Sequence, residues 1–137
     1  MSLVLDASVA LAWIYANETT NAILRVFEEL KASGAWIPAL WRWEVANALQ
    51  MNVRRGRHGT DFRDAALSNL AWFPIQVDAQ AEPEAWLGAL RIAGRCNLTV
   101  YDASFLEIAQ RRKLPLATLD RELRAAAERE KVRLLGI

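Results

Sequence analysis

The sequence predicts an α/β fold with a mainly parallel central sheet, and three observations support this prediction. Short apolar runs typical of strands alternate with longer helix-like segments along the whole chain. Three of these runs are followed directly by an aspartate, Asp6, Asp102 or Asp120, that opens the next helix-like segment. Hydrophobic residues make up 53% of the 137 residues, which is enough to fill one core. We therefore expect one domain over residues 1–137.

The predicted strands are short apolar runs that end at an acid, a proline or a turn. Leu3-Val4-Leu5 is the first, and Trp36-Ile37 is cut off by Pro38, which lacks a backbone N–H for a sheet. The predicted strands cover residues 3–5, 36–37, 74–77, 98–101, 116–118 and 132–135.

Helical spacing and helix-end signals define the segments between these strands. Gly34 and Gly56 follow helix-like segments as glycines do at helix C-termini. Thr60 can cap the next helix, with Asp61 favourably placed in its first turn, and Pro83 suits the start of another. The predicted helices cover residues 7–16, 20–32, 40–55, 60–72, 83–95, 103–112 and 121–131.

The acids of this pattern predict a divalent metal site. The carboxyl ends of parallel strands meet at one crevice, so Asp6, Asp102 and Asp120 should lie close together. Glu44 lies along the edge of the apolar face of its predicted helix, three residues from Trp41, and should be partly buried. Close carboxylates repel by roughly 4 kcal/mol per pair at an effective dielectric constant of about 20, so such a cluster usually needs a cation. Oxygen ligands favour Mg²⁺ or Mn²⁺, as one ion or two.

Each of these polar residues also has an ordinary structural interpretation. The three aspartates can cap helices, and one carboxylate oxygen can cap while the other binds metal. Glu44 can form a salt bridge, for example with Arg42. Ser8 and Thr118, each two residues from an aspartate, can orient a metal-bound water or make local turn hydrogen bonds.

Four acid-containing motifs occur in order along the whole chain. They are Val4-Leu5-Asp6-Ala7-Ser8-Val9-Ala10-Leu11, Trp43-Glu44-Val45-Ala46-Asn47-Ala48-Leu49, Tyr101-Asp102-Ala103-Ser104-Phe105-Leu106-Glu107-Ile108-Ala109 and Leu116-Ala117-Thr118-Leu119-Asp120-Arg121-Glu122-Leu123. Together they resemble the PIN-domain nucleases, and most closely the VapC-type toxins of bacterial toxin–antitoxin pairs.

The resemblance implies a three-layer α/β/α fold and a Mg²⁺-dependent endoribonuclease site made of Asp6, Glu44, Asp102 and Asp120. It also implies a homodimer and a small antitoxin protein whose C-terminal segment occupies the active-site groove. We expect Asp6 and Asp102, in matched strand-end turns, to bind the metal directly. Asp120 would hold a second metal or a water, and Glu44 would orient the nucleophilic water.

The formal net charge of +1 means that RNA would have to be held by local basic groups. The candidates form two runs, although such a run is more often an ordinary solvated helix end. They are Arg54, Arg55 and Arg57, and Arg111, Arg112 and Lys113.

His58, the only histidine, is expected to face solvent rather than to bind a metal. Of the six tryptophans, Trp13 or Trp43 is expected to line a dimer or antitoxin surface, unless both are core residues.

Two other functions remain open from sequence: a metal-dependent DNA or flap nuclease or phosphohydrolase, and a non-catalytic PIN-like binding module. Cys96 is the only cysteine, which excludes an intramolecular disulfide and a thiolate zinc cluster. The start Met1-Ser2-Leu3 has no basic leader, and the apolar stretch 7–16 is shorter than the roughly 20 residues that span a bilayer. We therefore expect a reduced, cytoplasmic location and no membrane partner.

Overall fold

The computed structural model describes residues 1–137 and contains one five-stranded sheet in which all strands are parallel. The strand order is β3-β2-β1-β4-β5. The strands are β1 (Leu3–Leu5), β2 (Ala35–Pro38), β3 (Ile75–Asp78), β4 (Leu116–Ala117) and β5 (Leu134–Leu135). The predicted α/β class with a mainly parallel sheet is confirmed.

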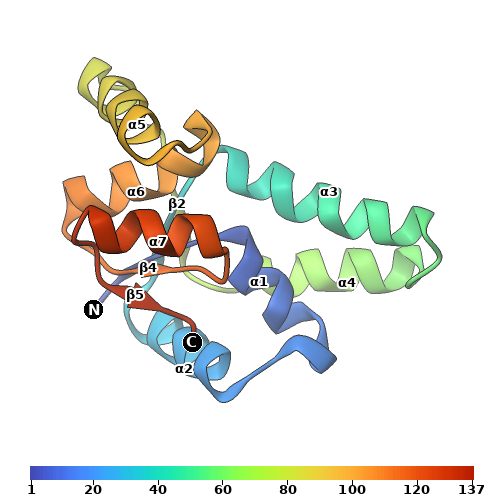
Figure 1. The fold of residues 1–137 in the computed structure, drawn as a ribbon. Helices are drawn as coiled ribbons and strands as arrows, with labels where there is room; N and C mark the ends of the chain where they lie inside the picture. The colour runs from blue at the N-terminus through green and yellow to red at the C-terminus, as the bar shows by residue number, and fades with distance from the viewer.

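Seven α-helices and one short 3-10 helix connect the strands. Figure 1 shows α6 and α7 on one face of the sheet and α2 on the other, while α3 and α4 form a hairpin that projects to one side. The helices are α1 (Ala7–Ile14), η1 (Ala16–Glu18), α2 (Asn21–Ser33), α3 (Leu40–Arg54), α4 (Thr60–Ala71), α5 (Pro83–Cys96), α6 (Val100–Arg112) and α7 (Arg121–Arg129). The three-layer architecture is confirmed. None of these helices has both the length and the apolar character needed to cross a bilayer.

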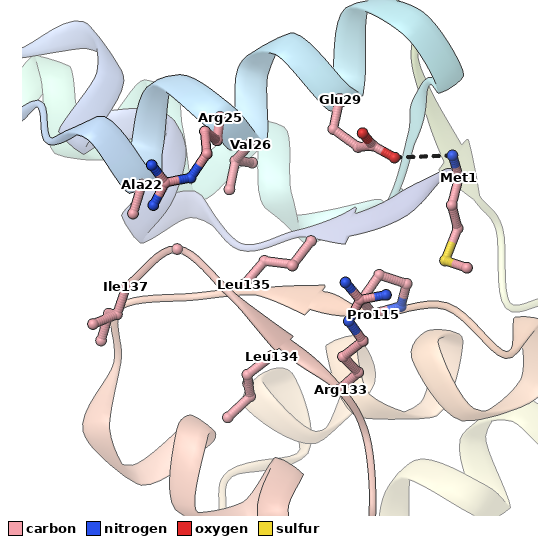
Figure 2. A pocket seen from close by; sticks show the side chains of 11 residues that line it. Met1, Ala22, Arg25, Val26, Glu29, Pro115, Arg133, Leu134, Leu135 and Ile137 are labelled. Atoms are coloured by element: carbon pink, nitrogen blue, oxygen red, sulfur yellow. Dashed lines mark hydrogen bonds and ion pairs between the residues drawn. The ribbon is translucent and has the colours of Figure 1, made fainter.

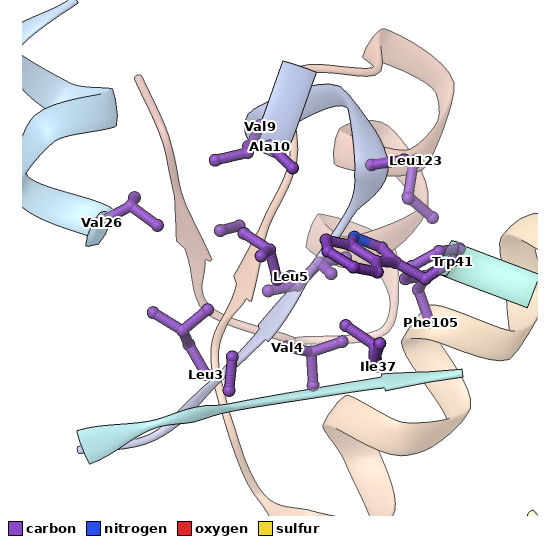
Figure 3. Packing of buried hydrophobic residues seen from close by; sticks show 14 of the residues in the cluster. Leu3, Val4, Leu5, Val9, Ala10, Val26, Ile37, Trp41, Phe105 and Leu123 are labelled. Atoms are coloured by element: carbon purple, nitrogen blue, oxygen red, sulfur yellow. The ribbon is translucent and has the colours of Figure 1, made fainter. Parts of the chain in front are cut away.

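The core lies on both sides of β1, which explains the unbroken apolar run of that strand. Leu3, Val4 and Leu5 are fully buried, as expected for the central strand of a parallel sheet covered on both faces. Trp41 from α3 and Phe105 from α6 pack into the same cluster (Figure 3). Because β1 is held from both faces, the residue that follows it has a firmly fixed position.

Local signals place most helix ends where the sequence predicted them. The Thr20 side chain accepts the N–H of Ile23 at 3.2 Å, and Gly34 ends α2 with a φ of 81° that glycine adopts without strain. Pro83 begins α5 as predicted. Gly59, and not Thr60, is the N-cap of α4, a shift of one residue.

The predicted strand at residues 98–101 is wrong. α5 ends at Cys96, Asn97 adopts a left-handed conformation with φ 54°, and Val100 already begins α6. The hydroxyl of Thr99 accepts the N–H of Asp102 at 3.1 Å and so caps α6 in the middle of the apolar run. A mostly apolar run of four residues does not by itself distinguish a strand from the start of a helix.

Candidate active site

The carboxyl ends of β1 and β4 form the point at which the sheet topology reverses. From β1 the chain adds β2 and β3 on one side, and then β4 and β5 on the other. Segments leaving β1 and β4 therefore diverge, which creates the crevice where open parallel sheets bind ligands. Asp6 directly follows β1, and Thr118 and Asp120 follow β4.

Asp6 is held by two hydroxyl groups, one from the first turn of α1 and one from the loop after β4. Ser8 Oγ donates to Asp6 Oδ2 at 2.6 Å, and Thr118 Oγ1 donates to the same oxygen at 2.8 Å. The Ser8 hydroxyl accepts the N–H of Leu119 at 3.0 Å, and the Thr118 hydroxyl accepts that of Asp120 at 3.1 Å. Each hydroxyl has a single proton, so both protons are committed to Asp6.

Asp6 is only 7% exposed and makes no side-chain cap to α1 although it occupies the N-cap position. The capping interpretation is therefore wrong for Asp6. Its second carboxylate oxygen, Oδ1, is not used by either hydroxyl. The sequence had assigned Ser8 and Thr118 either a water-orienting or a local turn role, and in the structure both bind Asp6.

Asp120 and Asp102 differ in their helix-end roles. Asp120 is the N-cap of α7 and its Oδ1 accepts the N–H of Leu123 at 2.8 Å, so the capping interpretation is confirmed for this residue. Asp102 lies in the first turn of α6, whose cap is Thr99, and therefore not in a strand-end turn. The expected match between the Asp6 and Asp102 turns is wrong.

Glu44 enters the same region from α3. It is half-buried beside Trp41 and Val45, which point into the core, as the helical spacing predicted. Its Oε1 is fully buried and has no hydrogen-bond partner, and Glu44 forms no ion pair with Arg42 or any other cation. A buried carboxylate oxygen without a partner is costly and needs an explanation.

The four acids influence one another electrostatically. Burial, followed by the charges of Asp6 and Asp102, raises the pKa of Glu44 from 4.5 to about 7. Burial, followed by the charges of Asp120 and Asp6, raises the pKa of Asp102. Burial also raises the pKa of Asp6 against the opposing hydrogen bonds, with a smaller contribution from Asp120. The four predicted acids therefore lie close enough for their charges to interact, and this group of acids is named the acidic crevice.

The donor chemistry of this crevice fits a hard divalent cation. A cation bound there would be coordinated by carboxylate oxygens, which are the ligands that hard divalent cations prefer. The Oε1 of Glu44, which has no hydrogen-bond partner, is one such oxygen. As the side chains are placed, no three histidine, cysteine, aspartate or glutamate groups form an arrangement that could hold a metal ion. The carboxylates would have to turn toward one another from these positions to share one.

Two of the basic residues predicted to bind RNA have a structural role. Arg112 Nε donates to Asp78 Oδ2 at 2.7 Å, and its guanidinium lies over the Trp36 ring, 3.4 Å from the ring centroid. Arg111 pairs with Asp78 at 2.9 Å and with Glu107 at 2.7 Å. These contacts fasten α6 to the end of β3 and engage part of each guanidinium, while Lys113 is exposed and makes no ion pair.

The second basic run lies at the tip of the α3–α4 hairpin. Arg54 and Arg55 are exposed, whereas the Arg57 guanidinium lies 4.0 Å from the centroid of the Tyr15 ring. His58 is half-buried and its Nε2 lies 2.9 Å from the Tyr15 hydroxyl, so it faces solvent only in part. The hydroxyl oxygen also accepts a hydrogen bond from Asn52 Nδ2 at 2.7 Å.

The tryptophans divide between core and surface. Trp13 is half-buried and stacks on Phe27 with ring centroids 4.7 Å apart, so it belongs to the core. Trp43 is 78% exposed on α3, which agrees with the prediction that it lies on the surface. Trp72 and Trp86 are also exposed, at 88% and 61%, and helical spacing alone did not predict this.

Arg124 is a residue of the site that the sequence analysis missed. Its Nη1 donates to the carbonyl oxygens of Thr118 at 2.6 Å and of Leu135 at 3.0 Å. The guanidinium therefore ties the loop that carries Thr118 to the last strand. No local signal distinguishes Arg124 from the other charged residues of α7, because both of its partners are backbone groups.

Residues 3–129 match the sequence profile of the PIN domain family. The chain belongs to this family. It is 31% identical to Ribonuclease VapC3 from Pyrobaculum aerophilum over 123 residues, which cover 90% of this chain and 92% of that protein. The PIN-domain resemblance noted in the sequence is thus confirmed.

Two solved structures share the PIN fold seen here. PAE2754 from Pyrobaculum aerophilum is 24% identical, with a TM-score of 0.65 over 92% of this chain and 84% of that one. VapBC2 from Rickettsia felis, solved bound to a DNA fragment from its promoter, has a TM-score of 0.70 at 9% identity. The match covers 98% of this chain and 97% of the solved chain.

Proposed function

We propose that this PIN-domain protein is a metal-dependent endoribonuclease of the VapC type. The observation that carries the proposal is the crevice at the carboxyl end of β1, where burial and, after it, neighbouring carboxylates raise the pKa values of Asp6, Glu44 and Asp102. The name of the relative Ribonuclease VapC3 supports RNA as the substrate. The other two buried acids, Asp78 and Glu107, are paired with Arg111 and Arg112, whereas the acids of the crevice have no cationic partner.

The four acids would share the work of such a site. Asp6 would present its Oδ1 to Mg²⁺ or Mn²⁺, because Ser8 and Thr118 hold its Oδ2. Asp102 would ligate the same ion, and Asp120 would offer the oxygen that it does not use for capping α7. When bound, the cation supplies a water of lowered pKa and positive charge near the phosphoryl oxygens.

Glu44 would act on the proton of the attacking water. Its pKa of about 7 means that the carboxylate can accept a proton near neutral pH, and its buried Oε1 has no competing partner. The hydroxyl groups of Ser8 and Thr118 would keep the Asp6 carboxylate from rotating away as the substrate phosphate approaches.

RNA cleavage by Asp6→Asn tests this proposal against a matched control. The purified protein is incubated with single-stranded RNA and with DNA of the same sequence, in Mg²⁺ and in EDTA. We expect cleavage of RNA alone, only in Mg²⁺, and none by Asp6→Asn. Asp61→Asn removes an exposed carboxylate in the first turn of α4 and should cleave normally. Cleavage in EDTA, or by a folded Asp6→Asn protein, would contradict the proposal.

We also propose that the protein is a toxin with a cognate antitoxin and that it forms a homodimer. The Rickettsia felis relative is itself a VapBC assembly, which supports an antitoxin partner. Trp43, which is exposed on the helix that carries Glu44, would line one of these interfaces. Expression should arrest growth, and co-expression of a short neighbouring reading frame should relieve the arrest. Light scattering of the purified chain gives its oligomeric state, and a monomer at micromolar concentration would contradict the homodimer.

A further inference from the structure

A groove between α2 and the edge strand β5 is separate from the acidic crevice. It encloses about 270 Å³, and none of Asp6, Glu44, Asp102 or Asp120 lines it. Figure 2 shows Leu135 pointing from β5 toward α2, with Val26 opposite it and Pro115 near one end. The floor of the groove is therefore apolar.

The backbone on the open side of β5 is available for another strand. β5 is the outermost strand of the sheet and pairs only with β4. Leu116 N donates to the carbonyl of Arg133 at 2.8 Å, and Thr118 N donates to that of Leu135 at 3.4 Å. Since backbone groups alternate in direction along a strand, those of Leu134 point away from β4. Such an edge can accept an extended peptide as a further strand.

The groove carries uncompensated positive charge. Arg25 and Arg133 both line it, and neither guanidinium forms an ion pair or a hydrogen bond. In Figure 2 they lie toward opposite ends, Arg25 near Ala22 and Arg133 near Pro115. The acid that lines the groove, Glu29, already pairs with the N-terminal amine at 2.9 Å.

We propose that this groove binds an extended acidic segment of another protein as a sixth strand beside β5. The segment would hydrogen-bond to the free edge, place an apolar side chain over Val26 and Leu135, and direct an acidic side chain at each arginine. A second copy of this chain fits less well, because a two-fold interface would bring the same unpaired guanidinium groups toward one another. RNA fits less well because the floor between the two cations is apolar.

The test uses two synthetic peptides that differ only in charge. One is acetyl-Thr-Glu-Thr-Val-Thr-Glu-Thr-amide, whose glutamates and valine share a face when the peptide is extended. The other has lysine in place of both glutamates. Binding is followed by the amide signals of ¹⁵N-labelled protein. We expect the glutamate peptide to shift the signals of residues 133–136, and the lysine peptide to bind roughly tenfold more weakly, as two surface ion pairs allow.

Charge reversal in the protein makes the test decisive. The double variant Arg25→Glu, Arg133→Glu should no longer bind the glutamate peptide and should bind the lysine peptide instead. Binding of the lysine peptide would also show that the variant is folded. Arg91→Glu reverses an exposed arginine on α5 outside the groove and should behave as the wild type. Equal binding of both peptides, or shifts confined to the acidic crevice, would overturn the proposal. Shifts of the β5 amide signals that depend only on protein concentration would indicate self-association and would overturn the proposal. Shifts of the same signals by a short RNA at a lower concentration than the peptide requires would also overturn it.

Discussion

Replacing Glu44 by glutamine should stabilise the metal-free protein at alkaline pH and abolish its activity. Glu44 keeps a buried oxygen without a partner and lies in the field of Asp6 and Asp102. Because its pKa is raised on folding, ionised Glu44 opposes folding. The wild type is therefore expected to be most stable, with respect to this group, below pH 4.5, and to lose that stability as the pH rises to about 7.

The magnitude follows from the raised pKa. A tenfold change in an ionisation constant corresponds to about 1.4 kcal/mol, so a rise from 4.5 to about 7 sets an upper limit of roughly 3.4 kcal/mol. Solvent screens a half-buried carboxylate, which reduces the expected effect to about 1–2 kcal/mol. For a chain of this size that is a rise in melting temperature of roughly 3–8 °C.

Urea denaturation in EDTA at pH 8 and at pH 4.5 measures this effect. Glu44→Gln should unfold at higher urea than the wild type at pH 8, with little difference at pH 4.5. Glu128→Gln, which removes an exposed carboxylate on α7, should match the wild type at both pH values. A destabilised Glu44→Gln at pH 8, or a gain that is equal at both pH values, would refute the electrostatic reasoning.

Three further predictions concern the metal, the hydroxyl pair and the ion pairs of α6. Mg²⁺ at about 100 times its dissociation constant should stabilise the wild type by about 2.7 kcal/mol, and equal stabilisation of Asp6→Asn in a thermal melt would contradict binding at the crevice. Thr118→Val keeps the shape of the side chain but removes a proton donated to Asp6, and should cost about 1–3 kcal/mol by urea denaturation, whereas Thr118→Ser should retain stability and RNA cleavage. The pKa of Asp78 is lowered because hydrogen bonds from Arg112, Gln80 and Arg111 together outweigh the opposing effect of burial, so its pairing is present above pH 3.8 and is lost on further acidification. Asp78→Asn should therefore cost roughly 2–4 kcal/mol at pH 7, and a similar loss at pH 2 would show that the effect is not ionic.

The sequence predicted the parts of the fold that depend on local chemistry. Pro38 ends β2, Gly34 ends α2 and Pro83 begins α5, each for a conformational reason that the residue carries with it. Asp6 and Asp120 were placed correctly because the direction of a parallel strand fixes where its following residue lies. Glu44 was placed correctly because helical spacing relates it to the buried Trp41 and Val45.

The features that the sequence did not predict depend on partners that are distant in sequence. Nothing near Arg111 and Arg112 shows that Asp78, on another element, will bind both of them. His58 is half-buried because Tyr15, the residue that follows α1, reaches the tip of the α3–α4 hairpin. The apolar run before Asp102 became a helix start because Thr99 can cap it, a competition that the run itself does not reveal.

The two hydrogen bonds from Arg124 to the carbonyls of Thr118 and Leu135 tie the outermost strand to the loop that supports Asp6. β4 and β5 are each only two residues long, so few ladder hydrogen bonds resist a displacement of the chain's end. Leu135 is thus linked to Thr118 both directly, through the Thr118 N–H at 3.4 Å, and through the Arg124 guanidinium, and the Thr118 hydroxyl in turn donates to Asp6. A displacement of β5 would therefore also move Thr118 and, with it, the carboxylate of Asp6.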